Sequence, residues 1–442
     1  MTGRVDMFVY YLQLAWRRCC RQPSAAALIM LTMAIGIAAC MTALTIFAAL
    51  SGQPLPGVSN HLYVVTMDAR TAVAKNGADY AQDSLLKLRD ARALVDAGRA
   101  SAQVALADSQ TVVSTEDGKR SDDVSGFLAY GQALRALQVP LRFGRPWTAA
   151  DQASDAPVVV IDSKLARKLF GRVDAVGRSV EMNHHRFRII GVTARWKPRE
   201  DFVDAEADSG TGTGVQLFVP AGAALDAGVG PATSGECGQA HTAVTFGAVN
   251  VHACRWLEVW VALDSPVAVQ RYQRFITNYA DAQHAAGRFV YPPHAKLYGT
   301  LAWLDLSHVV PDDVSLNVIL AGGFLFLCMI NVAGLLTARF LRRQVDAAIR
   351  RALGASRRQV FAQHLVEAGL FGVLGGVLAL PLAWFGLWVV RQQPVSYAPA
   401  AAFRPGTFLV LFALAIGVGL IVGVLPAWRV CRLPPAAQIR QG

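Results

Sequence analysis

Residues 342–358 read RRQVDAAIRRALGASRR and separate two long apolar runs. The stretch holds six arginines and a single acid, Asp346. Residues 314–338 before it and residues 368–390 after it contain no Asp, Glu, Lys or Arg. A helix needs about 20 apolar residues to cross the roughly 30 Å hydrocarbon core of a bilayer, so both runs predict transmembrane helices. The basic stretch is then a short connection at one membrane surface.

Two further runs of the same kind, residues 25–50 and 406–428, raise the predicted number of transmembrane helices to four. The tetrapeptide IAAC at residues 37–40 faintly resembles a lipoprotein cleavage box. Because mostly apolar residues continue after Cys40, the first run is predicted to stay as an anchor and not to be cleaved as a signal peptide.

The net charge of +11 is concentrated beside the apolar runs. Residues 51–315 carry 26 Lys and Arg against 28 Asp and Glu, whereas the rest of the chain carries 16 against 3. A nucleic-acid-binding protein would carry its basic patch on a soluble face, and this pattern is instead that of the positive-inside rule. The arginines therefore place both termini and the 339–358 connection in the cytoplasm, and they place the 51–315 block and the 391–405 loop on the other side.

The external block has the mixture of short strands and helices that predicts an α+β domain. Strand-like runs occur at residues 62–66, 156–162, 186–192, 215–220 and 255–263. Helix-like segments occupy residues 163–171, with Ser163 as N-cap, and residues 265–287, with Ser265 as N-cap before Pro266.

Three other parts of the external block have a biased composition. Residues 80–107 are polar and Ala-rich, which favours helix. Residues 202–214 and 226–250 are rich in Gly, Asp and Thr, which predicts loops.

Cys237 and Cys254 are the two of the seven cysteines that fall in the external block. Two cysteines in an oxidising compartment favour a disulfide. His241 and His252 lie between them in the pattern C-x3-H-x10-H-x-C, and two thiols with two imidazoles would also suit tetrahedral zinc. We prefer the disulfide and predict no metal site; zinc and free thiols are the alternatives.

No sequence signature of catalysis is present. The chain contains no GxxxxGK[ST] phosphate loop, no HExxH and no GxSxG. His184 and His185 are adjacent before a predicted strand, where neighbouring side chains point to opposite faces, so they are not expected to share a metal. We predict a non-catalytic chain with no cofactor of its own.

The apolar runs contain a few residues suited to helix packing. Asn331 lies deep in the second run, where an amide can hydrogen-bond to a neighbouring helix or line a transport path. Two GxxxG pairs permit close packing of helices: Gly372 with Gly376, and Gly419 with Gly423. Pro381 is a candidate kink in the third run.

The opening stretch has the pattern of one helix that ends and another that begins. An apolar face recurs at helical spacing through Val345, Ala348, Ile349, Ala352 and Leu353. Gly354 is a helix stop, and Ser356 with Gln359 forms an S-x-x-Q capping box. The residues alone leave two interpretations open, a helix in the lipid headgroups or a helix presented to a cytoplasmic partner.

Several segments resemble the FtsX/MacB-type ABC permeases. Residues 342–376, RRQVDAAIRRALGASRRQVFAQHLVEAGLFGVLGG, look like the loop and third span of that family. LQLAWRRCCRQPSAAALIMLTMAIGIA is similar to its first span, and LPAWRVCRLPPAAQIR to its C-terminal ending. Residues 141–192 resemble the MacB-type periplasmic core domain.

The resemblance implies a dimeric permease of the bacterial inner membrane that transmits ATP-driven motion to a periplasmic domain. Its candidate contacts to the ATPase are Arg343, Asp346, Arg350, Arg351, Gly354, Ser356 and Arg358. On this reading Val345, Ile349 and Leu353 seat the coupling helix on the membrane helices. The family often has Glu where Asp346 stands.

MacB carries its ATPase fused at the N-terminus, whereas about 24 residues precede the first predicted span here. We therefore expect a separate ABC ATPase subunit that binds the ATP and Mg. The other expected partners are a second permease copy or a paralogue, a periplasmic adaptor protein, an outer-membrane channel and membrane lipid, with no nucleic acid.

The leading functional hypothesis is efflux of a peptide, antibiotic or similar compound. The alternatives are a lipoprotein-releasing permease and an FtsX-like regulator of a periplasmic cell-wall hydrolase. An enzyme or receptor in the external domain is the weakest hypothesis, because no catalytic constellation is present.

The predicted fold class is a membrane protein with four transmembrane α-helices and a large α+β periplasmic domain inserted between the first and the second. In chain order we expect a basic amphipathic cytoplasmic segment (1–24), transmembrane helix 1 (25–50), the periplasmic domain (51–313), transmembrane helix 2 (314–338), the cytoplasmic coupling helix and turn (339–358), transmembrane helix 3 (359–390), a periplasmic loop (391–405), transmembrane helix 4 (406–428) and a cytoplasmic tail (429–442).

Overall fold

The computed structural model describes residues 2–55, 57–70, 84–194, 196, 215–232, 251–307, 312–342, 349, 354, 356–393 and 405–432. The chain divides into two units. The helical unit comprises Met1–Gly52 together with Val310–Gly442, and the inserted domain comprises Gln53–Val309.

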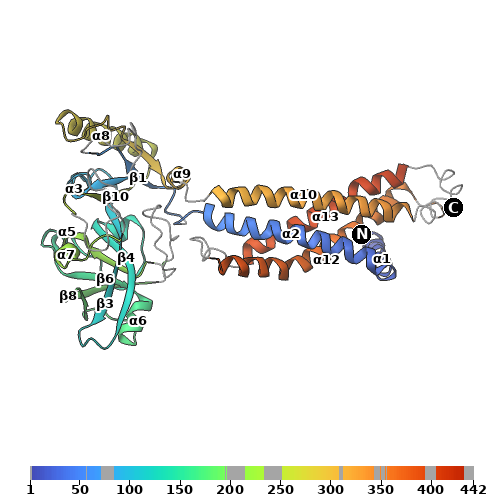
Figure 1. The fold of residues 1–442 in the computed structure, drawn as a ribbon, viewed down its shortest axis with the longest axis horizontal. Helices are drawn as coiled ribbons and strands as arrows, with labels where there is room; N and C mark the ends of the chain where they lie inside the picture. The colour runs from blue at the N-terminus through green and yellow to red at the C-terminus, as the bar shows by residue number, and fades with distance from the viewer. Residues whose placement is uncertain are drawn as a thin grey trace. The chain divides into compact units, whose positions relative to one another are not determined.

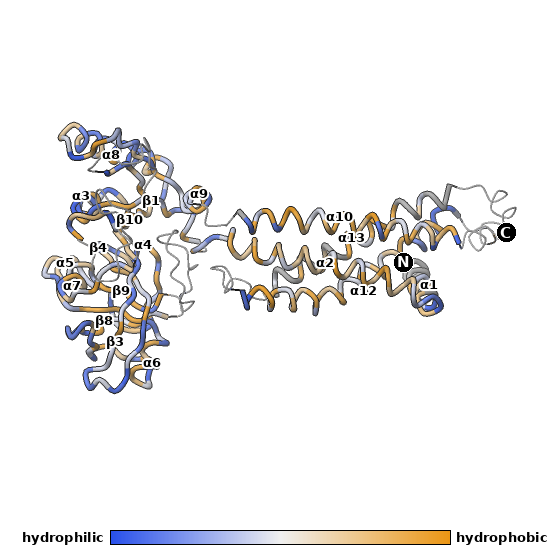
Figure 2. The backbone as a smooth tube through the Cα atoms, in the orientation of Figure 1, coloured by the Kyte–Doolittle hydropathy of each residue, from blue (hydrophilic) through white to orange (hydrophobic). Residues whose placement is uncertain are grey.

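The helical unit is built from segments at both ends of the chain. Its long helices are α1 (Thr2–Arg21), α2 (Pro23–Ser51), α10 (Asp312–Leu341), α12 (Arg357–Arg391) and α13 (Pro405–Arg432). Figure 1 shows α2, α10, α12 and α13 running alongside one another, and Figure 2 shows hydrophobic residues along their length.

Among the described residues, three helices are long and apolar enough to cross a membrane: α2, α10 and α12. Helix α13 has 28 residues and covers the fourth predicted span, but it is not among those three, so the fourth crossing stays a prediction. Helix α12 continues through Pro381, the predicted kink site, without ending there.

Small residues bring these helices close together. A Cβ atom on Gly36 of α2 would lie 2.9 Å from Cβ of Cys328 in α10. One on Gly375 of α12 would lie 2.9 Å from Cβ of Met33 in α2. Helices in lipid gain little from the hydrophobic effect between themselves, so close van der Waals contact of this kind contributes much of their association.

The described part of the inserted domain contains an 11-stranded mixed sheet with the order β11-β1-β10-β3-β4-β9-β6-β8-β5; in addition β2 pairs with β10, and β7 with β3 and β8. The strands are β1 (Leu62–Thr66), β2 (Leu85–Lys87), β3 (Ala102–Thr115), β4 (Ser121–Gly131), β5 (Leu141–Gly144), β6 (Val158–Asp162), β7 (Ser179–Met182), β8 (His185–Thr193), β9 (Leu217–Pro220), β10 (Arg255–Ala262) and β11 (Lys296–Gly299). The β4–β9 and β6–β8 pairs are parallel, and the other pairs are antiparallel.

Seven helices accompany these strands in the described residues of the inserted domain. They are α3 (Leu88–Asp96), α4 (Ala133–Ala136), α5 (Ala149–Ala153), α6 (Ser163–Phe170), α7 (Ala221–Asp226), α8 (Pro266–Ala285) and α9 (Thr300–Leu306). The domain is therefore of the predicted α+β class.

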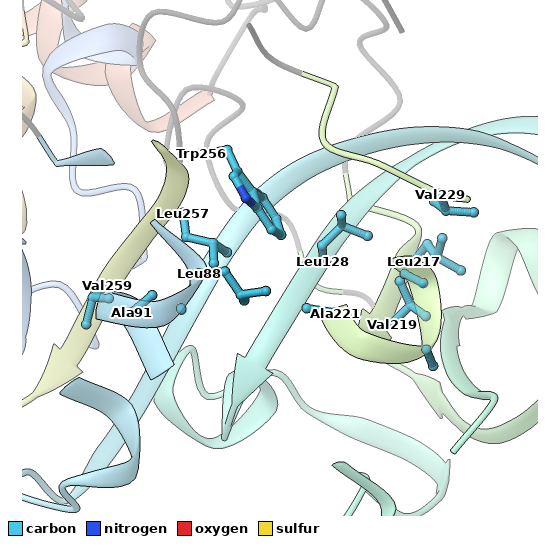
Figure 3. Close-up of a cluster of buried hydrophobic side chains, with 14 of the residues drawn as sticks. Leu88, Ala91, Leu128, Leu217, Val219, Ala221, Val229, Trp256, Leu257 and Val259 are labelled. Carbon is cyan, nitrogen blue, oxygen red and sulfur yellow. The ribbon is translucent and has the colours of Figure 1, made fainter. Parts of the chain in front are cut away.

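The sheet has a buried core on each face. Leu257 and Val259 of β10 belong to the cluster shown in Figure 3, whereas Trp260 belongs to the other core. Alternate residues of a strand point to opposite faces, which explains this separation. Trp256 joins the Figure 3 cluster beside Leu257 at the point where the pairing of β10 with β2 shifts register.

All five predicted strand runs are strands in the structure: β1, β6, β8, β9 and β10. Helix α8 begins as predicted, with Oγ of Ser265 accepting a hydrogen bond from the Ala268 amide. The N-cap of α6 is Asp162 and not the predicted Ser163, because the extended Asp162 places its carboxylate 2.6 Å from the Leu165 amide.

The prediction of helix across residues 80–107 is wrong on both sides of α3. Strand β2 occupies Leu85–Lys87 before this helix, and β3 begins at Ala102 after it. Val104, Ala105 and Leu106 are fully buried between β10 and β4. Pairing with two neighbouring strands outweighs the small helix preference of alanine, so tertiary contacts decide this segment.

Candidate functional site

Helix α12 begins at the capping box that the sequence predicts. Ser356 is the N-cap, and its backbone amide donates to Oε1 of Gln359 at 2.8 Å. The Gln359 amide donates in return to Oγ of Ser356 at 3.3 Å. Gly354, two residues earlier, has a φ of +99°, the left-handed conformation expected where a helix is stopped. The start of α12 is therefore specified locally.

A buried ion pair joins the last turn of α10 to α12. Nε of Arg339 lies 3.2 Å from Oε1 of Glu367, and the two side chains are 3% and 2% exposed. The pair lies on both sides of the basic stretch in the sequence, so it connects the helix that enters this stretch to the helix that leaves it. A charge-assisted hydrogen bond with so little solvent fixes the relative position of two helices more strictly than apolar packing does.

Aromatic rings lie on this ion pair and close to it in the two helices. The guanidinium carbon of Arg339 lies 5.1 Å from the ring centroid of Phe371, one turn beyond Glu367 in α12. The rings of Phe340 and His364 pack with their centroids 4.3 Å apart. Gln363 and His364 are also buried. The polar groups of this cluster are thus largely removed from solvent, and the Phe371 ring covers part of Arg339.

Helix α1 packs against α12, and its Cys19 packs against the core of the helical unit. Burial raises the pKa of its thiol, and the positive charge of Arg339 partly opposes that rise. Helix α1 thus packs on the helix that carries Glu367. We call these two residues with Cys19, Phe340, His364 and Phe371 the junction cluster.

The predicted ATPase-contacting residues are only partly described. Arg343, Asp346, Arg350 and Arg351 lie outside the described residues, as do Val345 and Leu353 of the predicted seating face. Ile349, which was also predicted to face the membrane helices, has a helical backbone but is 52% exposed. Gly354, Ser356 and Arg358 are exposed, so a partner can reach them.

The predicted packing residues divide into two groups. Gly372, Gly376, Gly419 and Gly423 are buried, and a Cβ atom on Gly419 would lie 2.6 Å from Cα of Gly372. Asn331 is exposed and does not pack between helices of this chain. The face of α10 that meets its neighbours contains Val332 and Leu336, and Asn331 is one position away from it.

Cys254 is buried and disulfide-bonded. Its predicted partner Cys237 lies outside the described residues, as does His241, so the pairing itself stays a prediction. Among the described residues no group of three or more His, Cys, Asp or Glu side chains could hold a metal ion.

Sequence reasoning missed the junction cluster. Asp346 and Glu367 are the two acids of residues 316–442, and Glu367 immediately precedes an apolar run. An ionised carboxylate beside a membrane span is energetically unfavourable unless it has a partner. Glu367 therefore predicts a buried cationic partner from the sequence alone. The predicted connection of residues 339–358 includes Arg339. The pairing itself depends on how two helices approach, which no local pattern records.

Two family profiles match the chain. The MacB-like periplasmic core domain matches residues 26–279, and the FtsX-like permease C-terminal domain matches residues 318–435.

Two relatives illustrate the similarity. The macrolide export ATP-binding/permease protein MacB of Agrobacterium fabrum is 23% identical over 438 residues, which are 98% of this chain and 61% of that protein. The pyoverdine export ATP-binding/permease protein PvdT of Pseudomonas aeruginosa is 26% identical over 312 residues, which are 69% of this chain and 40% of that protein. The chain thus spans less than two thirds of the length of either relative.

Among solved structures, the periplasmic region of MacB from Actinobacillus actinomycetemcomitans superposes with a TM-score of 0.35 at 14% identity, covering 57% of this chain and 94% of that one. The family assignment rests on the profiles, because the periplasmic core profile by itself covers more than half of the sequence. The chain belongs to the family of ABC transporter permeases that combine a MacB-like periplasmic core domain with an FtsX-like permease domain.

Proposed function

We propose that this chain is the permease subunit of an ABC exporter, and that it relays ATP-driven motion of a separate nucleotide-binding subunit to its periplasmic domain. The observation that carries the proposal is the way the basic stretch is connected. Helix α10 precedes it and α12 follows it, and Arg339 and Glu367 tie these two helices together. A force on residues 343–355 therefore acts on two helices of 30 and 35 residues that can cross a membrane.

The distribution of arginines supports the orientation that this mechanism needs. The positive-inside rule puts the basic stretch and both termini in the cytoplasm, where an ATPase is found, and the inserted domain in the periplasm. We propose that the chain works as a dimer with a second copy or a paralogue. A periplasmic adaptor and an outer-membrane channel complete the proposed export path.

The names of the relatives guide the proposed cargo. One is named for macrolide export and the other for pyoverdine export. We therefore propose a peptide, antibiotic or similar compound as the cargo, ahead of lipoprotein release or control of a cell-wall hydrolase.

The test is a charge reversal at the proposed contact surface. The double variant Arg350→Glu with Arg351→Glu should weaken capture of the co-encoded ATPase by at least about tenfold, since like charges at an interface are repulsive. Permease-dependent ATP hydrolysis should fall in parallel. The matched control is Arg391→Glu with Arg404→Glu, which makes the same charge change in the loop predicted on the opposite side and should leave capture unchanged. Equal capture by both double variants would refute the assignment.

A further inference from the structure

The ion pair of the junction cluster connects two helices at a cost in desolvation free energy. Moving two charges out of water costs several kcal/mol, and well-packed apolar residues often replace a buried ion pair without loss of stability. Arg339 and Glu367 are both almost fully buried. What an ion pair adds over apolar packing is geometry, because a guanidinium and a carboxylate bind in few orientations.

The ion pair connects the helices on the two sides of the basic stretch, where a fixed orientation can transmit movement. Arg339 stands in the last turn of α10, just before the basic stretch, and Glu367 stands in the helix that follows it. The basic stretch, residues 343–355, is thus preceded by Arg339 and followed by the Ser356 capping box and Glu367, and the ion pair connects the two sides. Without the pair, α10 and α12 would be connected mainly through α2 and α13, on which both of them pack, and a push on this stretch could be absorbed by movement of α10 relative to α12.

Aromatic contacts around the pair add to this connection. Phe371 of α12 lies over the guanidinium of Arg339 in α10, and Phe340 packs on His364 between the same two helices. Helix α1 packs against α12.

We infer that Arg339 and Glu367 are positioning residues for coupling: their ion pair makes α10 and α12 move as one body with the basic stretch. This inference rests on the proposed function, in which that stretch receives the motion of the ATPase. It assigns neither residue a contact with ATP or with the cargo.

The decisive variant replaces the pair by apolar residues of similar size, Arg339→Met with Glu367→Leu. The full chain would be purified with its co-encoded ATPase. A spin label on a cysteine introduced at the exposed Val112, in a chain with Cys20→Ser, would report on the inserted domain. We expect normal assembly, ATPase capture within about twofold of the native chain, and a midpoint of thermal unfolding within about 3 °C. Permease-dependent ATP hydrolysis and the ATP-dependent change in the spectrum should each fall at least about fivefold.

Two conservative variants separate positioning from folding. Arg339→Lys keeps both charges and should retain more coupling than the apolar double variant. Glu367→Asp keeps both charges but shortens the carboxylate arm, and it should lower coupling while the protein still assembles. If the apolar double variant does not assemble, the coupling measured for Glu367→Asp decides between a positioning role and a purely structural role of the ion pair.

Normal coupling in an assembled apolar double variant, or in Glu367→Asp when that variant decides, would overturn the inference and leave the pair a purely structural one. Failure of the proposed function looks different, because the native chain itself would then capture no ATPase or show no ATP-dependent spectral change.

Discussion

Gly419 of α13 and Gly372 of α12 face each other so closely that a Cβ atom on Gly419 would lie 2.6 Å from Cα of Gly372. The two helices therefore meet backbone to backbone. In lipid, where apolar side chains gain nothing by leaving the solvent, such contact is a main source of helix association. The same helix α12 carries Glu367, so its packing bears on the junction cluster as well.

Replacing Gly419 by Leu should force α12 and α13 apart. Insertion of a large side chain into a closed interface costs about 1 to 3 kcal/mol, and the purified protein should unfold at a correspondingly lower temperature. Gly417→Leu is the matched control, because a Cβ atom at Gly417 of the same helix would meet nothing within 4 Å. Equal unfolding temperatures for the two variants would show that α12 and α13 do not meet at Gly419.

Removal of the cap on α12 should fray its first turn. Ser356→Ala leaves the Gln359 amide without the Ser356 hydroxyl, which costs about 1 kcal/mol. Amide hydrogen exchange at residues 357–360 should become about fivefold faster, while exchange in the middle of α12 stays the same. Ser356→Asp supplies another acceptor and should restore protection. Unchanged exchange in Ser356→Ala would mean that the capping box contributes nothing.

The adjacent thiols of α1 should react at different rates with a maleimide. Burial raises the pKa of Cys19, so at neutral pH less of it is the reactive thiolate than for an ordinary thiol of pKa about 8.5. Cys20 is exposed. Mass-spectrometric mapping at pH 7 should show Cys19 modified at least about tenfold more slowly than Cys20. The Cys19 rate should still rise with pH above the ordinary thiol pKa, where less shifted thiols level off. Equal rates would place Cys19 away from the junction cluster.

A buried carboxylate stabilises the inserted domain. Asp90 of α3 accepts hydrogen bonds from Oη of Tyr279 and Nη2 of Arg288, each at 2.7 Å. Burial and this hydrogen bond raise the pKa of Tyr279, which therefore stays neutral and a donor throughout the physiological range. Asp90→Ala should cost about 2 to 3 kcal/mol, because it leaves both donors without this partner.

The loss at Asp90 can be measured as a lower unfolding midpoint of the full chain, followed by tryptophan fluorescence. Asp96→Ala is the control, since Asp96 is exposed and its bond to Tyr130 is worth about 0.5 kcal/mol or less. Similar losses of stability in the two variants would show that the buried Asp90 stabilises the domain no more than an exposed carboxylate does.

The disulfide of Cys254 can be assigned chemically. Peptide mapping without reduction should yield a Cys237-containing peptide linked to the Cys254 peptide, and reduction should separate them. Cys237→Ser should free the Cys254 thiol for alkylation. A linkage of Cys254 to another cysteine would refute the predicted pairing.

Much of the helical unit could be predicted because its signals are local. The apolar runs, the arginines beside them, Gly354 and the Ser356–Gln359 box each act over one to a few turns of helix. The predicted strands β1, β6, β8, β9 and β10 were likewise marked by runs of β-branched and aromatic residues. In these places the energy that decides the structure comes from neighbours in the sequence.

Two features show where local reasoning stops. Residues 102–107 favour helix by composition yet form part of β3, because β10 and β4 supply the hydrogen bonds on both sides. Arg339 and Glu367 appear in the sequence as a loop arginine and an isolated acid, and only the assembly of the helix bundle brings their side chains within 3.2 Å.

The sequence by itself therefore determined the class of the protein, a membrane chain with a basic connection between apolar helices and an inserted α+β domain. Tertiary structure alone decided the order of the strands, the face that Asn331 presents and the junction cluster. The physical reason is range: hydropathy, charge asymmetry and caps are sums over adjacent residues, whereas a buried ion pair is stable only after two distant helices have excluded water from it.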